Sequence, residues 1–284
     1  MARFFKRRRW RFLFLLAFFF AGSGIWVFVT TTVPDFDSFS ERKIIQSTKI
    51  YDRSGEKLLY DVHGAVKRTV IPFDKIPRYV KNSTLVIEDQ NFYRHFGVSP
   101  SGILRAFLIN LASGEARQGG STITQQLVKH TFLTPEKTII RKIKEVVLAL
   151  KIEARYSKDE ILYFYLNEIP YGSNAYGIEA ASQTYFGKSA ENLTLAEASY
   201  LAALLKAPTR YSPYGSRREE LEARKNMVLE RMKAEEFITA EEYEKALTEQ
   251  VKFLGKGVGS IKAPHFVLYV REYLVDKYGE DVVE

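Results

Sequence analysis

The chain has 284 residues, of which 46% are hydrophobic and 27% are charged, and this composition excludes a disordered or fibrous protein. Because cysteine is absent, disulfides, thiol nucleophiles and Cys-built metal sites are also excluded. The formal charge of +8 suggests a nucleic-acid partner at first sight. However, six of the 42 basic residues lie within the first eleven positions, and the rest of the chain is nearly neutral. We therefore expect no nucleic-acid partner.

The amino-terminal segment has the pattern of a membrane anchor. Residues 12–33 carry no charged side chain, and this run is long enough to cross a hydrocarbon core of about 30 Å. The basic residues 1–11 precede it, so the distribution of positive charge predicts a cytoplasmic N-terminus and an extracytoplasmic body. The alternative is a cleaved signal peptide, whose apolar region is ordinarily only about 7–15 residues long. We therefore predict a basic cytoplasmic tail followed by one transmembrane signal anchor.

The body of the chain reads as mainly α, with a small β element at its start. Residues 44–73 form the predicted β segment, with a hairpin turn at residues 52–55. After Pro77 the pattern is helical, with predicted helices over 100–114, 135–155, 174–186, 195–206, 217–236, 240–249 and 265–277. Three capping boxes are predicted, at Ser157 with Glu160, Thr194 with Glu197 and Thr239 with Glu242. The glycine-rich stretch 255–260 indicates a linker.

Glu88 opens the first of four stretches in which polar residues interrupt apolar helices. It follows the apolar run 85–87, so we expect its carboxylate to be partly desolvated. Desolvation raises the pKa of a carboxyl group, which suits a general base or acid. From spacing alone, an ordinary acidic residue near a helix end is the favoured interpretation.

The second stretch begins at Gly119-Gly120 and opens a helix rich in hydroxyl and amide side chains. Free backbone N–H groups at such a helix start can bind an anion. Gln125 and Lys129 are four residues apart and share one helix face. A glycine hinge followed by a helix cap explains the same pattern, and both interpretations stay open.

Arg141 and Glu145 define the third stretch, and they also share a helix face. Such a pair is most often a solvated salt bridge. The functional alternative is a cationic cluster for phosphates, in which Glu145 orders the cations or holds a divalent metal ion. The fourth stretch, residues 158–167, reads alone as a capped amphipathic helix with a structural role.

In this order the four stretches resemble the peptidoglycan glycosyltransferase domain of family 51. The matching patterns are E-D-x-x-F-x-x-H-x-G at 88–97, G-G-S-T-I-T-Q-Q at 119–126, R-K-x-x-E at 141–145 and K-x-x-I-L-x-x-Y-L-N at 158–167. The resemblance covers roughly residues 70–215. It implies a bacterial enzyme of the cytoplasmic membrane, with a lysozyme-like helical fold over residues 74–250 and a hydrophobic lobe that dips into the bilayer.

The resemblance also implies a reaction and assigns residues to it. Lipid II would be polymerised into β-1,4 glycan by inverting transfer from a donor glycan on polyprenyl pyrophosphate. The implied catalytic residues are Glu88 and Glu145. The implied donor and pyrophosphate ligands are Ser121, Thr122, Gln125, Gln126, Lys129, Arg141 and Lys142. The other motif residues are Asp89, Phe92, His95, Gly97 and Asn167. A divalent cation (Mg or Mn, with Glu145 as ligand), no organic cofactor, and partner proteins of wall synthesis, division or elongation are implied as well.

Some positions depart from the family pattern. Gln90 and Asn91 stand where arginine is frequent, which puts one phosphate contact in doubt, and Tyr163 replaces a common glutamate. The apolar helix between the first two motifs fits either a membrane-facing lobe or simple core packing, through Ile103, Leu104, Phe107, Leu108 and Leu111.

Residues 251–284 resemble the linker toward a transpeptidase domain, so we expect a truncated bifunctional protein, with a monofunctional transferase as the lesser option. A lytic transglycosylase or lysozyme-like wall hydrolase and a non-catalytic anchored scaffold remain the alternative functions.

Overall fold

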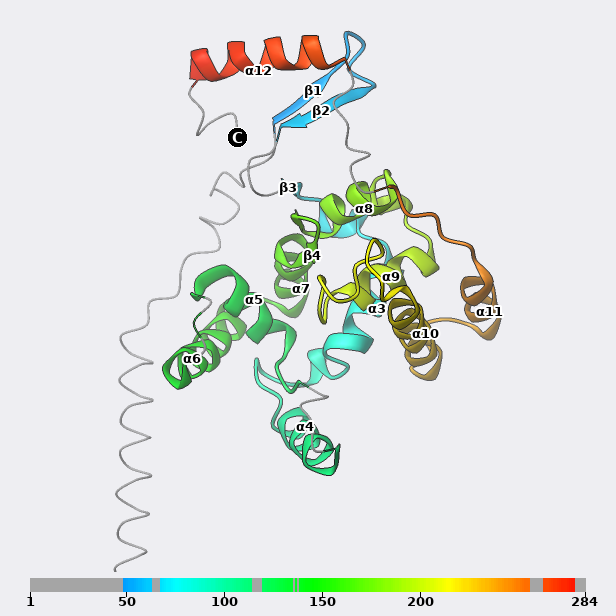
Figure 1. The fold of residues 1–284 in the computed structure, drawn as a ribbon. Helices are drawn as coiled ribbons and strands as arrows, with labels where there is room; N and C mark the ends of the chain where they lie inside the picture. The colour runs from blue at the N-terminus through cyan, green and yellow to red at the C-terminus, as the bar shows by residue number, and fades with distance from the viewer. Residues whose placement is uncertain are drawn as a thin grey trace, which may run out of the picture. The chain divides into compact units, whose positions relative to one another are not determined.

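The computed structural model describes most of the chain beyond the amino-terminal segment (Figure 1). The described residues are 48–62, 67–113, 119–134, 136, 138–255 and 263–278. The predicted tail and anchor, residues 1–33, lie outside them, as does most of the predicted linker at 255–260. Among the helices that are described, none has the length and apolar character needed to span a membrane.

The chain divides into two compact units. Within the described residues, the first unit comprises 94–161 and the second comprises 48–93 together with 162–278. The elements of the first unit are α4 (Pro100–Ser113), α5 (Ile123–Phe132), α6 (Ile139–Arg155) and the start of α7 (Lys158–Glu168). α5 packs against α6 through buried side chains that include Leu127, Val147 and Ile152. This pair of helices is the core of the first unit.

The second unit holds most of the remaining elements. Its first strands and helices are β1 (Thr48–Tyr51), β2 (Leu58–Val62), β3 (Lys67–Arg68), η1 (Phe73–Lys75) and α3 (Arg78–Glu88). η2 (Phe92–Arg94) spans the boundary with the first unit. After α7 come β4 (Pro170–Gly172), β5 (Ala175–Tyr176), α8 (Ile178–Phe186), η3 (Ala190–Asn192), α9 (Leu195–Leu204), α10 (Arg218–Ala234), α11 (Ala240–Thr248) and α12 (Pro264–Tyr278).

α9 is the centre of the second unit, and all ten of its residues are buried. Its sequence is apolar on every side except for Glu197, Ser199 and the Tyr200 hydroxyl, so the helix needs neighbours all round. α3 and α10 pack against it. The buried positions of α10 form one stripe at helical spacing: Leu221, Lys225, Val228, Leu229 and Met232.

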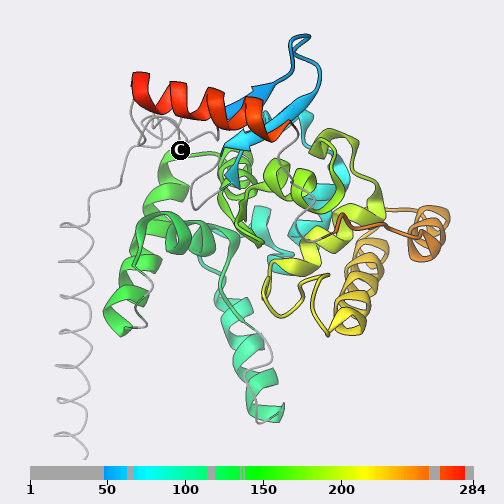
Figure 2. The ribbon, with the colours of Figure 1, turned by 45° about the horizontal axis from the view of Figure 1, so that its top comes forward.

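Two small sheets accompany the helices. β1 and β2 form the predicted hairpin, with a turn in which the Gly55 N–H donates to the Asp52 carbonyl at 3.0 Å. α12 packs on this hairpin (Figure 2), and Val267 of the helix shares a small apolar core with Ile50 of β1. The second sheet has the order β3-β5-β4, with β3 parallel and β4 antiparallel to β5.

The three predicted capping boxes are confirmed. Thr194 and Thr239 each accept a hydrogen bond from the main-chain N–H three residues on. The glutamate side chain at that position in turn accepts from the main-chain N–H of the threonine. Ser157 and Glu160 make the same reciprocal pair. Ser99 caps α4 by accepting from the Gly102 N–H.

Two predicted helix starts are wrong. The helix expected from residue 135 begins at Ile139, because Thr138 provides the N-cap by accepting from the Arg141 N–H at 3.1 Å. The helix expected from residue 174 begins at Ile178. Residues 170–176 form β4, a tight turn at 173–174 and β5 instead, and Gly177 precedes α8 with a positive φ of 80°. A short strand pair joined by a tight turn gives too weak a sequence signal to be separated from a helix start.

Candidate active site

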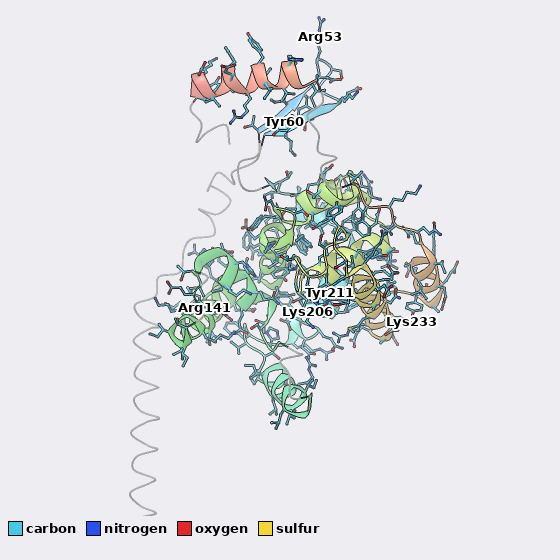
Figure 3. The ribbon with its side chains drawn as sticks, in the orientation of Figure 1. Arg53, Tyr60, Arg141, Lys206, Tyr211 and Lys233 are labelled. Carbon is cyan, nitrogen blue, oxygen red and sulfur yellow. The ribbon has the colours of Figure 1, made fainter. Side chains whose placement is uncertain are left out.

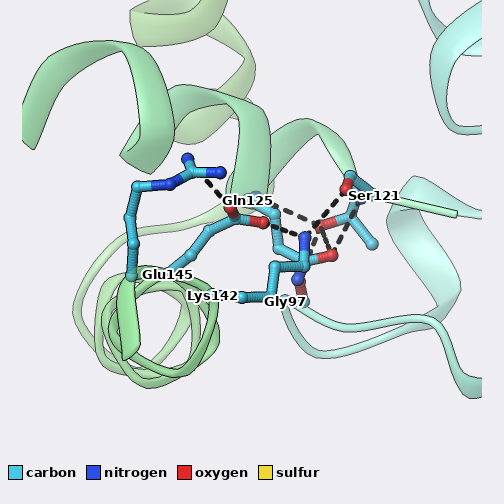
Figure 4. Close-up of polar contacts among 7 residues, drawn as sticks. Gly97, Ser121, Gln125, Lys142 and Glu145 are labelled. Carbon is cyan, nitrogen blue, oxygen red and sulfur yellow. Dashed lines mark hydrogen bonds and ion pairs between the residues drawn. The ribbon is translucent and has the colours of Figure 1, made fainter. Parts of the chain in front are cut away.

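Glu145 gathers two cations in the first unit (Figure 4). Its side chain is 2% exposed, with Lys142 one turn earlier donating to Oε1 and Arg141 Nη1 lying 3.8 Å from Oε2. Lys142 Nζ also donates to the Ser121 hydroxyl at 3.0 Å. The interpretation as a solvated salt bridge is therefore wrong, because the carboxylate is buried and bridges both cations.

The two cations of this cluster are themselves partly open to solvent. The side chain of Lys142 is 48% exposed and that of Arg141 is 18% exposed. The Nε of Arg141 is buried and has no hydrogen-bond acceptor within the described part of the chain. The cluster therefore presents positive charge to solvent on two side chains that Glu145 holds in place.

Thr122 and Gln125 support the cluster from behind rather than face solvent. Both are buried, and they form a capping box at the start of α5, in which the Gln125 Oε1 accepts from the Thr122 N–H at 3.1 Å. The Thr122 hydroxyl donates to the Gly97 carbonyl at 2.6 Å. Of the two open interpretations of this stretch, the structure shows the helix cap.

The remaining predicted residues of the first unit flank this support. Gln126 and Lys129 follow on α5, each half-buried, and His95 is half-buried two residues before Gly97. The structure thus brings Ser121, Arg141, Lys142 and Glu145 together by direct contact, with Gly97, Thr122 and Gln125 beneath them.

Glu88 belongs to the second unit, where it is the last residue of α3 and its side chain is 11% exposed. This low exposure confirms the prediction that the Glu88 carboxylate is partly desolvated. Arg224 Nη2 on α10 lies 3.9 Å from its Oε1. Asp89 is the buried C-cap of α3, and Phe92 is fully buried in the short η2 helix that follows.

More cations surround Glu88 than the sequence indicated. Burial lowers the pKa of the Lys206 ammonium and Arg224 lowers it further, while Glu88 opposes both effects. Arg210 and Arg231 act on Lys206 in the same direction as Arg224. Lys206 and Tyr211, both labelled in Figure 3, come from the segment between α9 and α10. None of these cations was predicted from the sequence, where the only signal was the seven-residue spacing of Arg224 and Arg231 on one helix face.

Two buried phenols also lie within electrostatic reach of Glu88. Burial raises the pKa of Tyr165 and Tyr171 far above the ordinary value for tyrosine, and the Glu88 carboxylate raises both further. Both phenols therefore stay protonated near the carboxylate at neutral pH.

Asn167 has a structural role in the second unit. Its Oδ1 accepts from the Ile71 N–H at 2.9 Å, and its Nδ2 donates to the carbonyls of Ile71 and Tyr163. The amide thereby ties the segment after β3 to α7. Two family departures also have local partners: Gln90 donates to Glu235, the C-cap of α10, and the Tyr163 ring meets Phe73 edge-on.

The arrangement does not fit a metal site built by the protein. Within the described residues, no three His, Asp or Glu side chains converge on one point. The only predicted ligand, Glu145, turns one oxygen to Lys142 and the other to Arg141.

Comparison with known proteins shows the family. The family model described as Transglycosylase matches residues 55–233, which is more than half of the chain. The chain therefore belongs to the transglycosylase family, and the resemblance found in its four motifs is confirmed.

The most similar relatives include penicillin-binding proteins 1A. That of Aquifex aeolicus is 43% identical over 263 residues, covering 90% of this chain and 35% of the relative. That of Escherichia coli K12 is 40% identical over 268 residues, covering 93% and 31%. The chain thus spans about a third of the length of these relatives. The crystal structure of penicillin-binding protein 1A from Haemophilus influenzae aligns with a TM-score of 0.47 and 28% identity, covering 84% of this chain and 25% of that one.

Proposed function

We propose that this chain is a peptidoglycan glycosyltransferase that polymerises lipid II into β-1,4 glycan strands. The observation that carries the proposal is the buried Glu145 with Lys142 and Arg141, in a chain of the transglycosylase family. A pyrophosphate is a dianionic group that binds best to prearranged cations with donors to spare. The side chains of Lys142 and Arg141 are 48% and 18% exposed, so both cations can contact that ligand.

In the proposed reaction Glu88 is the general base. It takes the proton from the 4-hydroxyl of the acceptor sugar as that oxygen attacks the anomeric carbon of the donor. The bond from that carbon to the pyrophosphate oxygen breaks in the same displacement, which inverts the anomeric configuration. The leaving pyrophosphate is already a stable anion that needs no proton, so one carboxylate base and a cation cluster suffice. Lys129, Arg141 and Lys142 would bind the departing group.

The proposal includes a membrane location. Residues 12–33 would anchor the chain in the bacterial cytoplasmic membrane with the N-terminus in the cytoplasm and a lysozyme-like catalytic body outside. The exposed side chains of α4 support a membrane-facing surface rather than core packing, since Ile103 is 49%, Leu104 59% and Leu111 69% exposed. Other proteins of wall synthesis, division or elongation would be its partners.

A divalent cation, Mg or Mn, enters the proposal only as a companion of the substrate phosphates. The Glu145 oxygens already face two cations, so the ion would draw most of its ligands from the pyrophosphate. No step above depends on it.

The proposal is tested by supplying the purified protein with lipid II and, separately, with isolated cell-wall sacculi. We expect glycan polymer from lipid II and no release from sacculi. Soluble fragments from sacculi would instead identify a wall hydrolase, and no product from either substrate would favour a scaffold.

A further inference from the structure

Arg224 is the basic residue of α10 that the structure fixes beside Glu88. Its side chain is 11% exposed, and its Nη2 lies 3.9 Å from the Glu88 Oε1. At the other end of the guanidinium, Nε donates to the main-chain carbonyl of Ala203 at 3.0 Å. The same group lies 5.6 Å from the centre of the Tyr211 ring, within cation–π range. Contacts on three sides therefore hold one planar group in one orientation.

The contact with Glu88 is an ion pair without a hydrogen bond. A separation of 3.9 Å exceeds the length of an N–H···O hydrogen bond, so this Nη2 attracts the carboxylate without donating a hydrogen bond to it. Burial favours the neutral form of a carboxyl group, and a cation at this distance opposes that effect. Arg224 stays charged despite its burial, because guanidinium groups do not deprotonate in proteins.

Other charged and titratable groups also act at this place. They are Lys206 after α9, Arg231 on α10, Tyr165 on α7, Tyr171 on β4 and Asp89 at the end of α3. Arg231 donates to the Val86 carbonyl, so its guanidinium is engaged with the backbone of α3. Lys206 is mostly exposed on a flexible stem. Arg224 combines an ion-pair contact to Glu88 with fixed contacts at its other end.

We infer that Arg224 is a positioning residue for Glu88, which orients the carboxylate and keeps it ionised before proton transfer. This inference rests on the proposed function, in which Glu88 is the base. A base must be ionised to accept the proton of the acceptor hydroxyl, and removing a paired cation from a nearly buried carboxylate favours its neutral form. The planar guanidinium of Arg224 can both orient and charge-stabilise Glu88, because its Nε donates to the Ala203 carbonyl while its Nη2 faces the Glu88 carboxylate.

The test is the pH dependence of lipid II polymerisation by the full chain carrying Arg224→Gln or Arg224→Lys. The Gln variant loses the positive charge, so the acidic limb of kcat/KM should move about one pH unit upward. Its kcat at neutral pH should fall about tenfold, while KM for lipid II changes less than about twofold. The Lys variant keeps the charge but not the fork, so its acidic limb should stay in place while kcat falls about threefold.

Arg217→Gln is the matched control, because Arg217 is 53% exposed and pairs with Glu220 at the start of the same helix. We expect this control to have the wild-type profile. If the Arg224→Gln limb coincides with the wild-type limb, or only KM changes, the inference is overturned. If the Gln variant does not fold, the Lys variant decides, because a wild-type kcat there overturns the positioning role. Failure of the wild-type chain to polymerise lipid II would instead refute the proposed function itself.

Discussion

The hydroxyl of Thr122 donates a hydrogen bond of 2.6 Å to the main-chain carbonyl of Gly97, which lies 25 residues earlier. The same hydroxyl caps α5 by accepting from the Gln125 N–H. One side chain thus joins the end of the first motif to the start of the second. Ser121, directly before Thr122, accepts a hydrogen bond from Lys142 of the cation cluster. The position of Gly97 therefore affects how that cluster is supported.

Gly97→Ala should destabilise the chain and reduce polymerisation. Gly97 has a φ of 73°, where an L-residue is strained, and an added Cβ would lie 3.0 Å from both the Ala149 carbonyl oxygen and the Glu153 Cγ. The left-handed strain and the close contact together should lower the free energy of unfolding by about 2–3 kcal/mol. Denaturant unfolding measures this loss, and lipid II turnover measures its effect on the cluster.

Gly55→Ala is the matched control for this substitution. Gly55 has nearly the same φ, 76°, but no atom lies within 4 Å of an added Cβ. We expect it to cost only the conformational strain, about 1 kcal/mol. Equal losses at both glycines would show that the close packing at Gly97 has no energetic effect.

Glu145→Gln should reduce kcat/KM for lipid II by about 100-fold. The substitution removes the buried charge that holds Lys142 and Arg141, so neither cation keeps a fixed orientation toward a pyrophosphate. The loss should appear in steady-state polymerisation rates with circular dichroism unchanged. Glu136→Gln, at an exposed loop position of the same unit, should have the wild-type rate. A wild-type rate for Glu145→Gln would remove this carboxylate from the proposed site.

Asn167→Ala should reduce stability more than catalysis. It leaves the Ile71 N–H and carbonyl without their amide partner in a buried place, and an unsatisfied buried polar group costs about 1–3 kcal/mol. We therefore expect the free energy of unfolding to fall by about 2–3 kcal/mol, measured by denaturant titration. The exposed Asn192→Ala variant should change it by less than about 0.5 kcal/mol. Lost activity at full stability would contradict a structural role.

Local sequence signals predicted much of the fold. The capping boxes at Thr194 and Thr239 depend on residues only three positions apart, so the sequence alone contains the whole interaction. By contrast, Thr134 and Thr138 are both acceptable caps, and which one starts α6 depends on packing that local patterns do not encode. The sheet β3-β5-β4 pairs residue 67 with residue 175, which no window of sequence could indicate.

In the candidate site, too, contacts between near neighbours in sequence were predictable, whereas burial and long-range contacts were not. Arg141 and Glu145 are i, i+4 neighbours, so their pairing was predictable, but the burial of Glu145 was not. The Arg224 contact with Glu88 joins helices 136 residues apart, and periodicity on α10 said only that Arg224 and Arg231 share a face. The site residues could be named from motifs, while their electrostatic surroundings required the fold.

Glu88→Gln should abolish polymerisation while the chain remains folded. The amide has the size of the carboxylate but cannot accept the hydroxyl proton, so the rate should fall by about 1,000-fold or more. Binding of lipid II should persist, because the proposed pyrophosphate ligands lie on α5 and α6 and are unchanged. Glu230→Gln, an exposed glutamate of α10, is the matched control and should have the wild-type rate. The measurement is single-turnover transfer with saturating lipid II, which separates chemistry from binding. Transfer at the wild-type rate by a folded Glu88→Gln variant would show that another group takes the proton.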